Sequence, residues 1–218
     1  MSIKLPTDFD WRSITPSDSP RTPIDIMADP TFQRLATPEL KPGDQAFGFR
    51  RPLYDFSSGQ QVATGDTFDL LERATDNPIA LIFGSYTCPP FRAQLESLHN
   101  LWMRWREQIE FLVVYIREAH PEDGWVVTSN RTDDIRVSDP TTTAARTEVA
   151  TACALRLEIQ MPVVVDAIDD NIANAYGALP DRLYLIALGV TVAFQGEPGP
   201  WGFIPDALES AIVTATNS

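Results

Sequence analysis

The chain has 218 residues, 44% of them hydrophobic, and a formal charge of −13 at pH 7 from 30 acidic and 17 basic residues. This length suits one folded domain with an extension. Because the excess negative charge repels phosphate backbones and anionic membrane surfaces, we expect neither nucleic acid nor a membrane among the partners. The sequence shows no apolar run near the roughly 20 residues of a bilayer-spanning helix and no apolar core of a signal peptide, which predicts a cytoplasmic protein.

Two cysteines and two histidines are too few for a disulfide framework or a structural zinc site, so we expect no bound metal. In a reducing compartment a cysteine is usually either an inert core residue or a reactive thiol. The sequence around Cys88 and around Cys153 must therefore decide between these two interpretations.

Residues 1–41 hold many Pro, Asp, Ser and Thr residues and only a short helical pattern, over residues 30–35. Such a composition does not supply enough apolar surface for a core of its own. We therefore predict an N-terminal extension over residues 1–41 and a single domain over residues 42–218.

Three apolar runs rich in β-formers predict strands buried on both faces, at residues 78–84, 111–116 and 162–166. Apolar residues at spacings of three and four predict helices between and after these runs. Strands that alternate with helices predict an α/β, thioredoxin-like fold with a central mixed β-sheet flanked by helices. We further expect a hairpin over 52–65 that turns at Ser57, Ser58 and Gly59, an antiparallel pair at 182–186 and 191–196, and helices within 67–77, 89–106, 142–158, 171–177 and 205–215.

Cys88 stands in the stretch GSYTCPPF, where a buried strand ends and a helix begins. Loops at the carboxyl ends of strands commonly build the sites of α/β proteins. Pro89 and Pro90 fit the first turn of a helix, whose free N–H groups and positive dipole end favour a thiolate over a thiol. The pattern predicts a reactive Cys88 thiolate; the alternative is a loop that needed a small residue there.

The second thiol, Cys153, lies in the middle of a predicted helix on its apolar side. Packing is the simpler interpretation of this position, and a resolving thiol for Cys88 is the alternative.

His120 follows the second core strand and is expected near Cys88 at the same edge of the sheet, as a general acid or base. Glu118 precedes it by two residues, where a carboxylate can orient the imidazole or raise its pKa. Arg182 opens a later strand and can bring a positive charge to the thiolate. The alternative for each is an ordinary loop or solvated residue.

Five motifs carry a resemblance to a known family, and they follow one another as GSYTCPPF, YIREAHPEDGW, MPVVVD, AYGALPDRLYLI and GEPGPWGF. Together they resemble the catalytic domain of the iodothyronine deiodinases, from about Pro78 to the C-terminus. More distantly, the order of strand, cysteine helix and arginine strand is similar to that of peroxiredoxins and glutathione peroxidases. These families imply a thioredoxin fold.

The resemblance also implies roles for individual residues. Cys88 falls where the family has its nucleophilic selenocysteine, which takes iodine from an aromatic ring in a reductive deiodination. His120 falls on the family's histidine that helps to protonate the ring, Glu118 precedes it as in the family, and Arg182 falls on an arginine associated with the substrate. Family members use an external thiol as cosubstrate and no bound metal or prosthetic group.

The sequence departs from the family's pattern in several places. Cysteine replaces selenocysteine, and because a thiol is less acidic we expect lower activity on iodine. Tyr86 stands where many animal enzymes have another cysteine, and residues 129–138, SNRTDDIRVS, lack the family's second histidine. We also expect this chain to lack the membrane-spanning segment of the animal enzymes.

Three functions fit these residues. The leading hypothesis is a thiol-dependent oxidoreductase that removes iodine from iodinated phenols, with a Cys88 thiolate as iodine acceptor and His120 as proton donor. The alternatives are a peroxiredoxin-like thiol peroxidase that reduces peroxides through Cys88, and a non-catalytic redox sensor. The expected partners are a small halogenated aromatic compound or a peroxide and a thiol reductant such as thioredoxin or glutathione; pairing into a homodimer, common among redoxins, is left open.

Aromatic residues in the same motifs are candidates for stacking on a substrate ring, although such residues are at least as often part of a core. They are Tyr86, Phe91, Trp125, Trp201 and Phe203. We expect the first three of these, together with Ser85 and Thr87, to bind the substrate or to stabilise the thiolate. Ser85 and Thr87 would do so through their hydroxyl groups.

Overall fold

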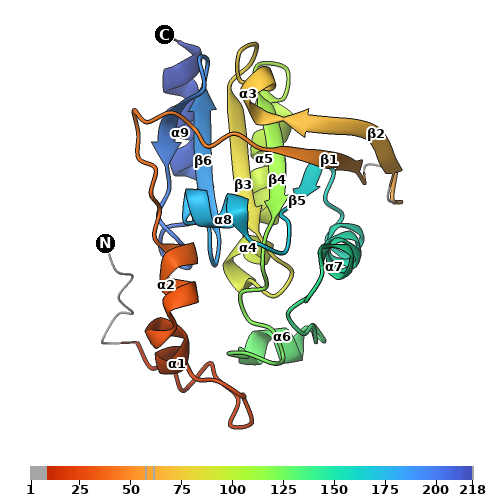
Figure 1. Cartoon of the computed structure of the whole chain (residues 1–218), viewed down its shortest axis with the longest axis vertical. Helices are drawn as coiled ribbons and strands as arrows, with labels where there is room; N and C mark the ends of the chain where they lie inside the picture. The colour runs from red at the N-terminus through yellow and green to blue at the C-terminus, as the bar shows by residue number, and fades with distance from the viewer. Residues whose placement is uncertain (1–8, 57, 61, 218) are drawn as a thin grey trace.

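A seven-stranded sheet forms the centre of the protein in a computed structural model, which describes residues 9–56, 58–60 and 62–217 (Figure 1). The strands are β1 (Arg50–Asp55), β2 (Val62–Asp69), β3 (Ile79–Gly84), β4 (Glu110–Tyr115), β5 (Val163–Val165), β6 (Arg182–Ala187) and β7 (Thr191–Gln195). The three apolar runs of the sequence became β3, β4 and β5, as predicted. The expected turn residue Ser57 lies outside the described residues.

The strand order is β2-β1-β5-β4-β3-β6-β7, and the sheet is mixed. Strand β4 runs parallel to β3 on one side and to β5 on the other, whereas β6 is antiparallel to β3. The outer pairs β1–β2 and β6–β7 are antiparallel. The carboxyl ends of β3 and β4 therefore meet the amino end of β6 at one edge of the sheet, and this edge carries the site.

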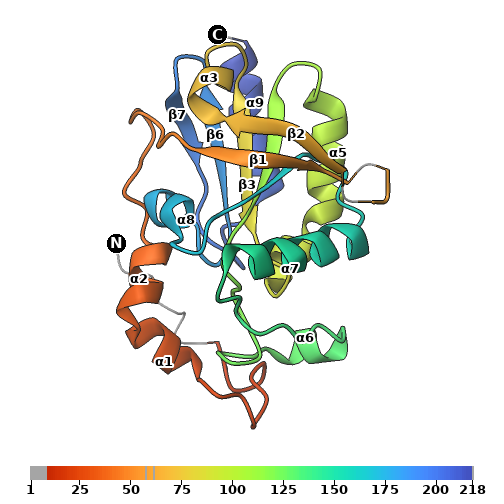
Figure 2. The same cartoon turned by 45° about the vertical axis from the view of Figure 1, so that its right-hand side comes forward.

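Helices cover both faces of the sheet, as expected. One apolar core lies between the sheet and α4, α5, α7 and α9, and a second lies between the sheet and α2, α3 and α8 (Figures 1 and 2). None of the helices in the described part of the chain is long and apolar enough to cross a bilayer. The helices are α1 (Pro23–Ala28), α2 (Pro30–Ala36), α3 (Leu70–Arg73), α4 (Pro89–Ala93), α5 (Leu95–Trp105), α6 (Thr128–Thr132), α7 (Thr143–Arg156), α8 (Asn171–Tyr176) and α9 (Pro205–Thr216).

The helix that follows Cys88 is shorter than the sequence predicted. We expected one helix to about residue 106, but it breaks at Gln94, which has φ −97° and ψ 0°. The Gln94 N–H donates to the carbonyls of both Pro90 and Phe91, which is a tightened last turn. The helix that Cys88 caps therefore has only five residues.

Helices α1 and α6 were not predicted, and β2 continues into the region where we expected a helix. The sequence does carry a signal for α1: the Thr22 side chain caps the Asp25 N–H, Asp25 caps Thr22 in return, and Pro23 takes the first position. Helix α6 has no such signal, because its five residues show no apolar period.

The described part of the N-terminal extension is attached to the connections that follow β4 and precede β6. The Leu179 N–H donates to the Leu35 carbonyl at 3.0 Å, and the Arg21 N–H donates to the Gly124 carbonyl at 3.1 Å. Gly177, at φ +54°, permits the close approach, because a Cβ there would strike the backbone at Pro38. Helices α1 and α2 thus lie at the same end of the molecule as α4 and α6 (Figure 1); the boundary at residue 41 stays a prediction.

Candidate active site

Cys88 occupies the position that the sequence predicted. It follows β3, caps the amino end of α4, and has Pro89 at the first helical position. Its N–H donates to the Ser85 carbonyl at 3.2 Å, which closes the loop between strand and helix. The sulfur therefore lies at the edge of the sheet where β3 and β4 end.

The chemical state of this sulfur differs from our prediction of a reactive thiolate. Cys88 is completely buried. Burial, together with the nearby negative charge of Asp181, raises the pKa of the thiol well above its ordinary value. A five-residue helix has too few aligned peptide dipoles to offset that desolvation. In the resting structure Cys88 is thus a protonated thiol.

Asp181 is the partner of the thiol, and the sequence analysis missed it. The Cys88 Sγ–H donates to Asp181 Oδ2 at 3.0 Å, while Asp181 Oδ1 accepts from the Gly199 N–H at 2.5 Å. Burial raises the pKa of this carboxyl group to about 6. At neutral pH it is an ionised acceptor aimed at a thiol proton, which is the arrangement of a general base.

The loop around Gly199 closes over this pair. A Cβ at Gly199 would lie 2.5 Å from Asp181 Oδ2 and 2.8 Å from Cβ of Pro90, so only glycine allows such an approach. Cys88 is consequently covered from the side of the β7–α9 connection.

Arg182 does not approach the sulfur, contrary to our expectation. Its guanidinium group donates to the carbonyls of Gly177 at 2.8 Å, Gly196 at 2.7 Å and Ala36 at 3.1 Å. Successive side chains of a strand point to opposite faces, and Asp181, not Arg182, lies on the face of Cys88. Arg182 instead anchors the end of α2 to the sheet.

Glu118 is buried in the segment that follows β4. We had expected its carboxylate to contact the imidazole of His120, but it does not. Its Oε2 accepts from the N–H of Thr87 at 2.9 Å and from the Thr87 hydroxyl at 2.6 Å. Its Oε1 accepts from the Tyr115 hydroxyl. Burial raises the pKa of Glu118. This carboxyl group fixes the residue next to Cys88 and so sets the position of the cysteine loop.

His120 lies next to the cysteine loop, as predicted. Its N–H donates to Thr87 Oγ1 at 3.0 Å, and its Nδ1 lies 3.2 Å from the carbonyl oxygen of Trp125. Burial lowers the pKa of the imidazole to about 4, so the ring is neutral at pH 7. Because a carbonyl only accepts, Nδ1 carries the proton and Nε2 is a free acceptor. His120 must therefore gain a proton before it can donate one from Nε2.

The hydroxyl groups of Ser85 and Thr87 were expected to bind the thiolate, but they serve the loops. Ser85 Oγ accepts from the Ala119 N–H at 3.2 Å, and Thr87 Oγ1 is bonded as described above. Asn130 of α6 completes this scaffold by donating to the Thr87 carbonyl at 2.9 Å. No local sequence pattern indicates Asn130, since its partner lies 43 positions away.

Arg92 is a second residue that the sequence analysis missed. Its Nη1 donates to the Tyr86 carbonyl at 2.8 Å, and its Nη2 lies 3.1 Å from Asp133 Oδ2. Its positive charge acts to lower the pKa of Cys88, although burial and Asp181 have the larger effects. Arg92 thus takes part of the role that we had assigned to Arg182.

The predicted substrate-binding aromatic residues separate into two groups. Phe91 and Phe203 are core residues, with ring centroids 6.5 Å apart, and cannot stack on a ligand in this structure. Tyr86 is buried, and its N–H donates to the Tyr115 hydroxyl at 3.1 Å. The Trp125 ring lies edge-to-face with His120 at 4.5 Å, next to the reacting groups.

Comparison with known proteins shows the family to which the chain belongs. The sequence model of the family described as iodothyronine deiodinase matches residues 54–213. The chain belongs to the iodothyronine deiodinase family. It is 31% identical over 208 residues to thyroxine 5-deiodinase of Ovis aries, with 92% of this chain and 68% of the relative covered. It is 34% identical over 203 residues to thyroxine 5-deiodinase of Homo sapiens, with 86% of this chain and 62% of that relative covered.

The solved structures that this deiodinase-family chain resembles have the thioredoxin fold, which confirms the predicted fold class. One, assigned as a thiol:disulfide interchange protein from Chlorobium tepidum, gives a TM-score of 0.55 at 18% identity over 82% of this chain and 99% of that chain. Another, the thioredoxin domain of a thiol-disulfide oxidoreductase from Bacteroides vulgatus, gives 0.54 at 12% identity over 82% of this chain and 100% of that chain. The family membership also confirms that the chain is an oxidoreductase.

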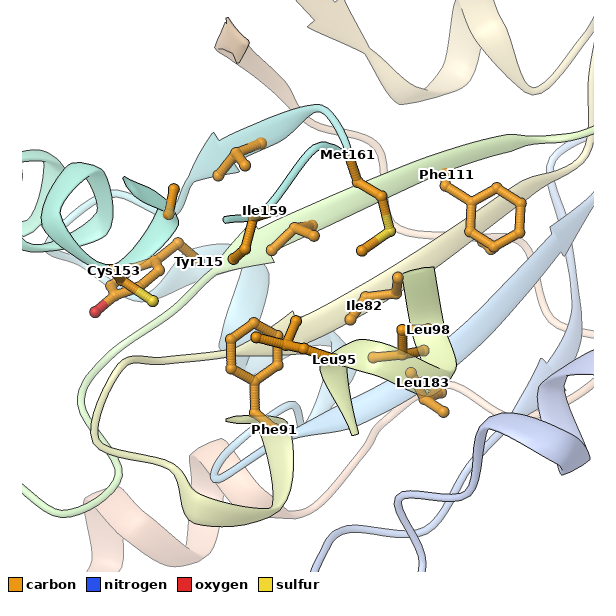
Figure 3. Close-up of a cluster of buried hydrophobic side chains, with 14 of the residues drawn as sticks. Ile82, Phe91, Leu95, Leu98, Phe111, Tyr115, Cys153, Ile159, Met161 and Leu183 are labelled. Carbon is orange, nitrogen blue, oxygen red and sulfur yellow. The ribbon is translucent and has the colours of Figure 1, made fainter. Parts of the chain in front are cut away.

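The second thiol of this deiodinase-family chain is a core residue. Cys153 of α7 is buried beside Tyr115, among apolar side chains (Figure 3). Burial, then the charge of Glu118, raises the pKa of its thiol well above the ordinary value. Both cysteines are free thiols. A resolving role for Cys153 remains a proposal without a supporting contact.

Proposed function

We propose that this deiodinase-family oxidoreductase removes iodine from iodinated phenols, with the Cys88 sulfur as iodine acceptor and an external thiol as reductant. The proposal rests on the hydrogen bond of 3.0 Å between Cys88 Sγ and Asp181 Oδ2 at the edge of the sheet. A buried thiol beside an ionised carboxylate has a built-in acceptor for the proton that it must lose to become a nucleophile.

In the first step, the proton of Cys88 passes to Asp181. The sulfur then attacks the iodine of the substrate, an S–I bond forms, and the C–I bond breaks with its electron pair left on the ring. The ring carbon takes one proton in exchange for the iodine. The balance is Cys88–SH plus Ar–I giving Cys88–S–I plus Ar–H, so the ring is reduced and the sulfur oxidised.

His120 is suited to move the proton on the substrate. Its bare Nε2 can take the proton of a phenol hydroxyl and deliver it to the ring carbon that bears the iodine, which yields the keto form. When the iodine leaves, the ring becomes aromatic again as a phenolate, and the proton held by Asp181 returns to the phenol oxygen. His120 thus acts as the expected proton donor, but only after it has accepted the proton.

An external thiol regenerates the enzyme. The thiol attacks Cys88–S–I, releases iodide and a proton, and leaves a mixed disulfide; a second thiol then frees Cys88 and departs as part of a disulfide. Thioredoxin and glutathione are the thiol classes that we propose for this step. The curated relatives act on thyroxine by name, and we extend only the iodinated aromatic class to this chain.

Iodide release from 3,5-diiodotyrosine in the presence of dithiothreitol tests the proposal. We expect release by the unmodified protein, loss to background in Cys88→Ser, and strong loss in His120→Ala. His99→Ala is the matched control and should keep the original rate, because His99 lies on α5, where its Nε2 accepts from the Gln160 N–H. Release that is unaffected by Cys88→Ser would contradict the proposal.

Peroxide consumption by the same proteins separates the alternatives. The likeness to solved structures at 18% and 12% identity concerns the fold alone, so it does not favour a peroxidase. Peroxide loss that needs Cys88 but not His120, without iodide release, would replace the deiodinase proposal with a peroxidase. Absence of both activities, with a Cys88 that oxidises reversibly, would leave a redox sensor.

A further inference from the structure

Two loops form the rim above Cys88. On one side, Gly199 packs against Asp181 and Pro90, and Trp201 follows two residues later. On the other side, His120 contacts the Cys88 loop through Thr87, and Trp125 lies against its imidazole at 4.5 Å. These two loops flank the loop of the buried Cys88 on two sides.

Trp11 of the N-terminal extension spans this rim. Its ring lies edge-to-face with Trp125 at 5.7 Å and with Trp201 at 5.9 Å. The Phe9 ring lies 4.7 Å from that of Trp11 and 5.9 Å from that of Trp201. The two tryptophans thus accept an aromatic ring from a segment that is distant in sequence.

The segment that carries Trp11 is held at the rim by polar contacts and by packing of Trp11 and Ile14 on the apolar cluster of Ile26, Trp125 and Val127. The Trp125 Nε1–H donates to Thr15 Oγ1 at 2.9 Å, and the Thr128 N–H donates to the Ile14 carbonyl at 2.8 Å. An ion pair of 2.7 Å between Asp18 and Arg131 is exposed at the aspartate. In Figures 1 and 2 the segment before α1 lies beside the loop that precedes α6. An ion pair exposed in this way contributes little to holding the segment.

Part of the aromatic cluster is open to solvent. Trp201 is 54% exposed and Phe9 is 39% exposed, whereas Trp125 and Cys88 are buried. Large aromatic side chains left at a rim without full burial commonly mark a place where an apolar ligand binds. The ring of Trp11 thus leaves much of Trp201 exposed, while Trp125 beneath it is buried.

We propose that the space between Trp125 and Trp201 is a binding subsite for one aromatic ring of the substrate, and that Trp11 fills this subsite in the free protein. An electron-poor iodinated phenol that replaced Trp11 would keep the same ring-to-ring contacts. This inference rests on the proposed function for the identity of the ring. It predicts that substrate binding displaces the segment and opens the path to Cys88.

Alkylation of Cys88 by iodoacetamide measures the opening without any deiodination. In a Cys153→Ser background, Trp11→Ala should increase the labelling rate about tenfold, since two edge-to-face ring pairs are lost. Trp11→Phe should stay within about threefold of the parent, because it keeps a ring. Ile24→Ala is the control, as Ile24 is 76% exposed in α1. Labelling of Trp11→Ala at the parent rate would overturn the proposal.

Binding of 3,5-diiodotyrosine to Cys88→Ser protein, which cannot turn over, tests the subsite itself. Removing Trp11 should tighten binding about tenfold, whereas Trp201→Ala should weaken it about tenfold. Equal affinity in all three proteins would overturn the subsite. If these shifts occur but the unmodified enzyme releases no iodide, the proposed function fails and the aromatic subsite stands.

Limited trypsin digestion provides the same test on the unmutated chain. Arg12 follows Trp11 directly and is exposed, so displacement of the segment should speed cleavage there. Saturating 3,5-diiodotyrosine should increase that cleavage several-fold, while cleavage at the exposed Arg136 stays constant. Unchanged cleavage after Arg12 would contradict displacement of Trp11 by the ligand.

Discussion

Asp181 and Arg182 are neighbours in the chain, but they serve different faces of the sheet. Asp181 accepts a hydrogen bond from the Cys88 thiol in the core beneath α4 and α5, whereas Arg182 binds three carbonyl groups on the face of α2 and α8. We propose that the carboxylate prepares the thiol for reaction, and the guanidinium group holds the extension in place. Neighbouring residues at the start of a strand can therefore have different roles, because their side chains point to opposite faces of the sheet.

The largest effect is expected at Asp181. Asp181→Asn keeps an oxygen for the Gly199 N–H but removes the proton acceptor, so iodide release at pH 7 should fall about 100- to 1000-fold. The same change removes a like charge and should lower the pKa of Cys88. If attack needed only a stable thiolate, the variant would be faster than the parent protein. Asp206→Asn, at an exposed position, is the control in steady-state assays.

Arg182→Met should have its effect on stability. The change leaves the carbonyls of Gly177, Gly196 and Ala36 without their donor, which costs about 2–4 kcal/mol of unfolding free energy. Urea titration measures this loss, and Arg136→Met, which removes only an exposed ion pair, should change stability by less than about 0.5 kcal/mol. Iodide release that falls as far as in Asp181→Asn, from fully folded protein, would show that our separation of the two residues is wrong.

The pH dependence of stability gives a smaller effect with a definite sign. Burial raises the pKa of Asp181 from 3.8 to about 6, so the folded chain holds this proton where the unfolded chain has lost it. The stabilising contribution of this proton to the free energy of unfolding is fully present below pH 3.8 and is lost as the pH rises through about 6. A shift of this size corresponds to at most about 3 kcal/mol.

The neighbouring His120 acts in the opposite direction, because its lowered pKa of about 4 makes folding more favourable as the pH rises from there. The comparison of Asp181→Asn with the parent protein separates the two groups. The variant should gain stability relative to the parent between pH 4.5 and 7.5, by about 1–3 kcal/mol in urea titrations. A difference between the two proteins that stays constant over this range would show that Asp181 does not hold its proton on folding.

The sequence was informative wherever the signal was local. Continuous apolar runs located β3, β4 and β5, and the Pro89–Pro90 pair placed Cys88 at a helix start. The capping residues Thr22 and Asp25 are likewise a local signal for the start of α1. These features depend on spacing along the chain, so a single sequence contains them.

The environment of the sulfur was not predictable in the same way. The partner of Cys88 lies 93 positions away, and its charge has the opposite effect on the pKa to that of a helix start. We assigned Arg182 to the site, but the residue that contacts the thiol is its neighbour Asp181. Only the register of β6 against β3, with Phe83 opposite Arg182, determines which of the two faces the thiol. Docking of Trp11 on Trp125 is equally long-range.

The protonation state of Cys88 tests the central claim most directly. A ¹³C NMR titration of the Cys88 Cβ in Cys153→Ser protein reports the thiol and the thiolate separately. We predict a thiol throughout the neutral range, with a pKa above that of an ordinary cysteine and a lower pKa in Asp181→Asn, because burial and the carboxylate both disfavour the thiolate. A thiolate already present at pH 7, or a pKa that Asp181→Asn leaves unchanged, would contradict the account.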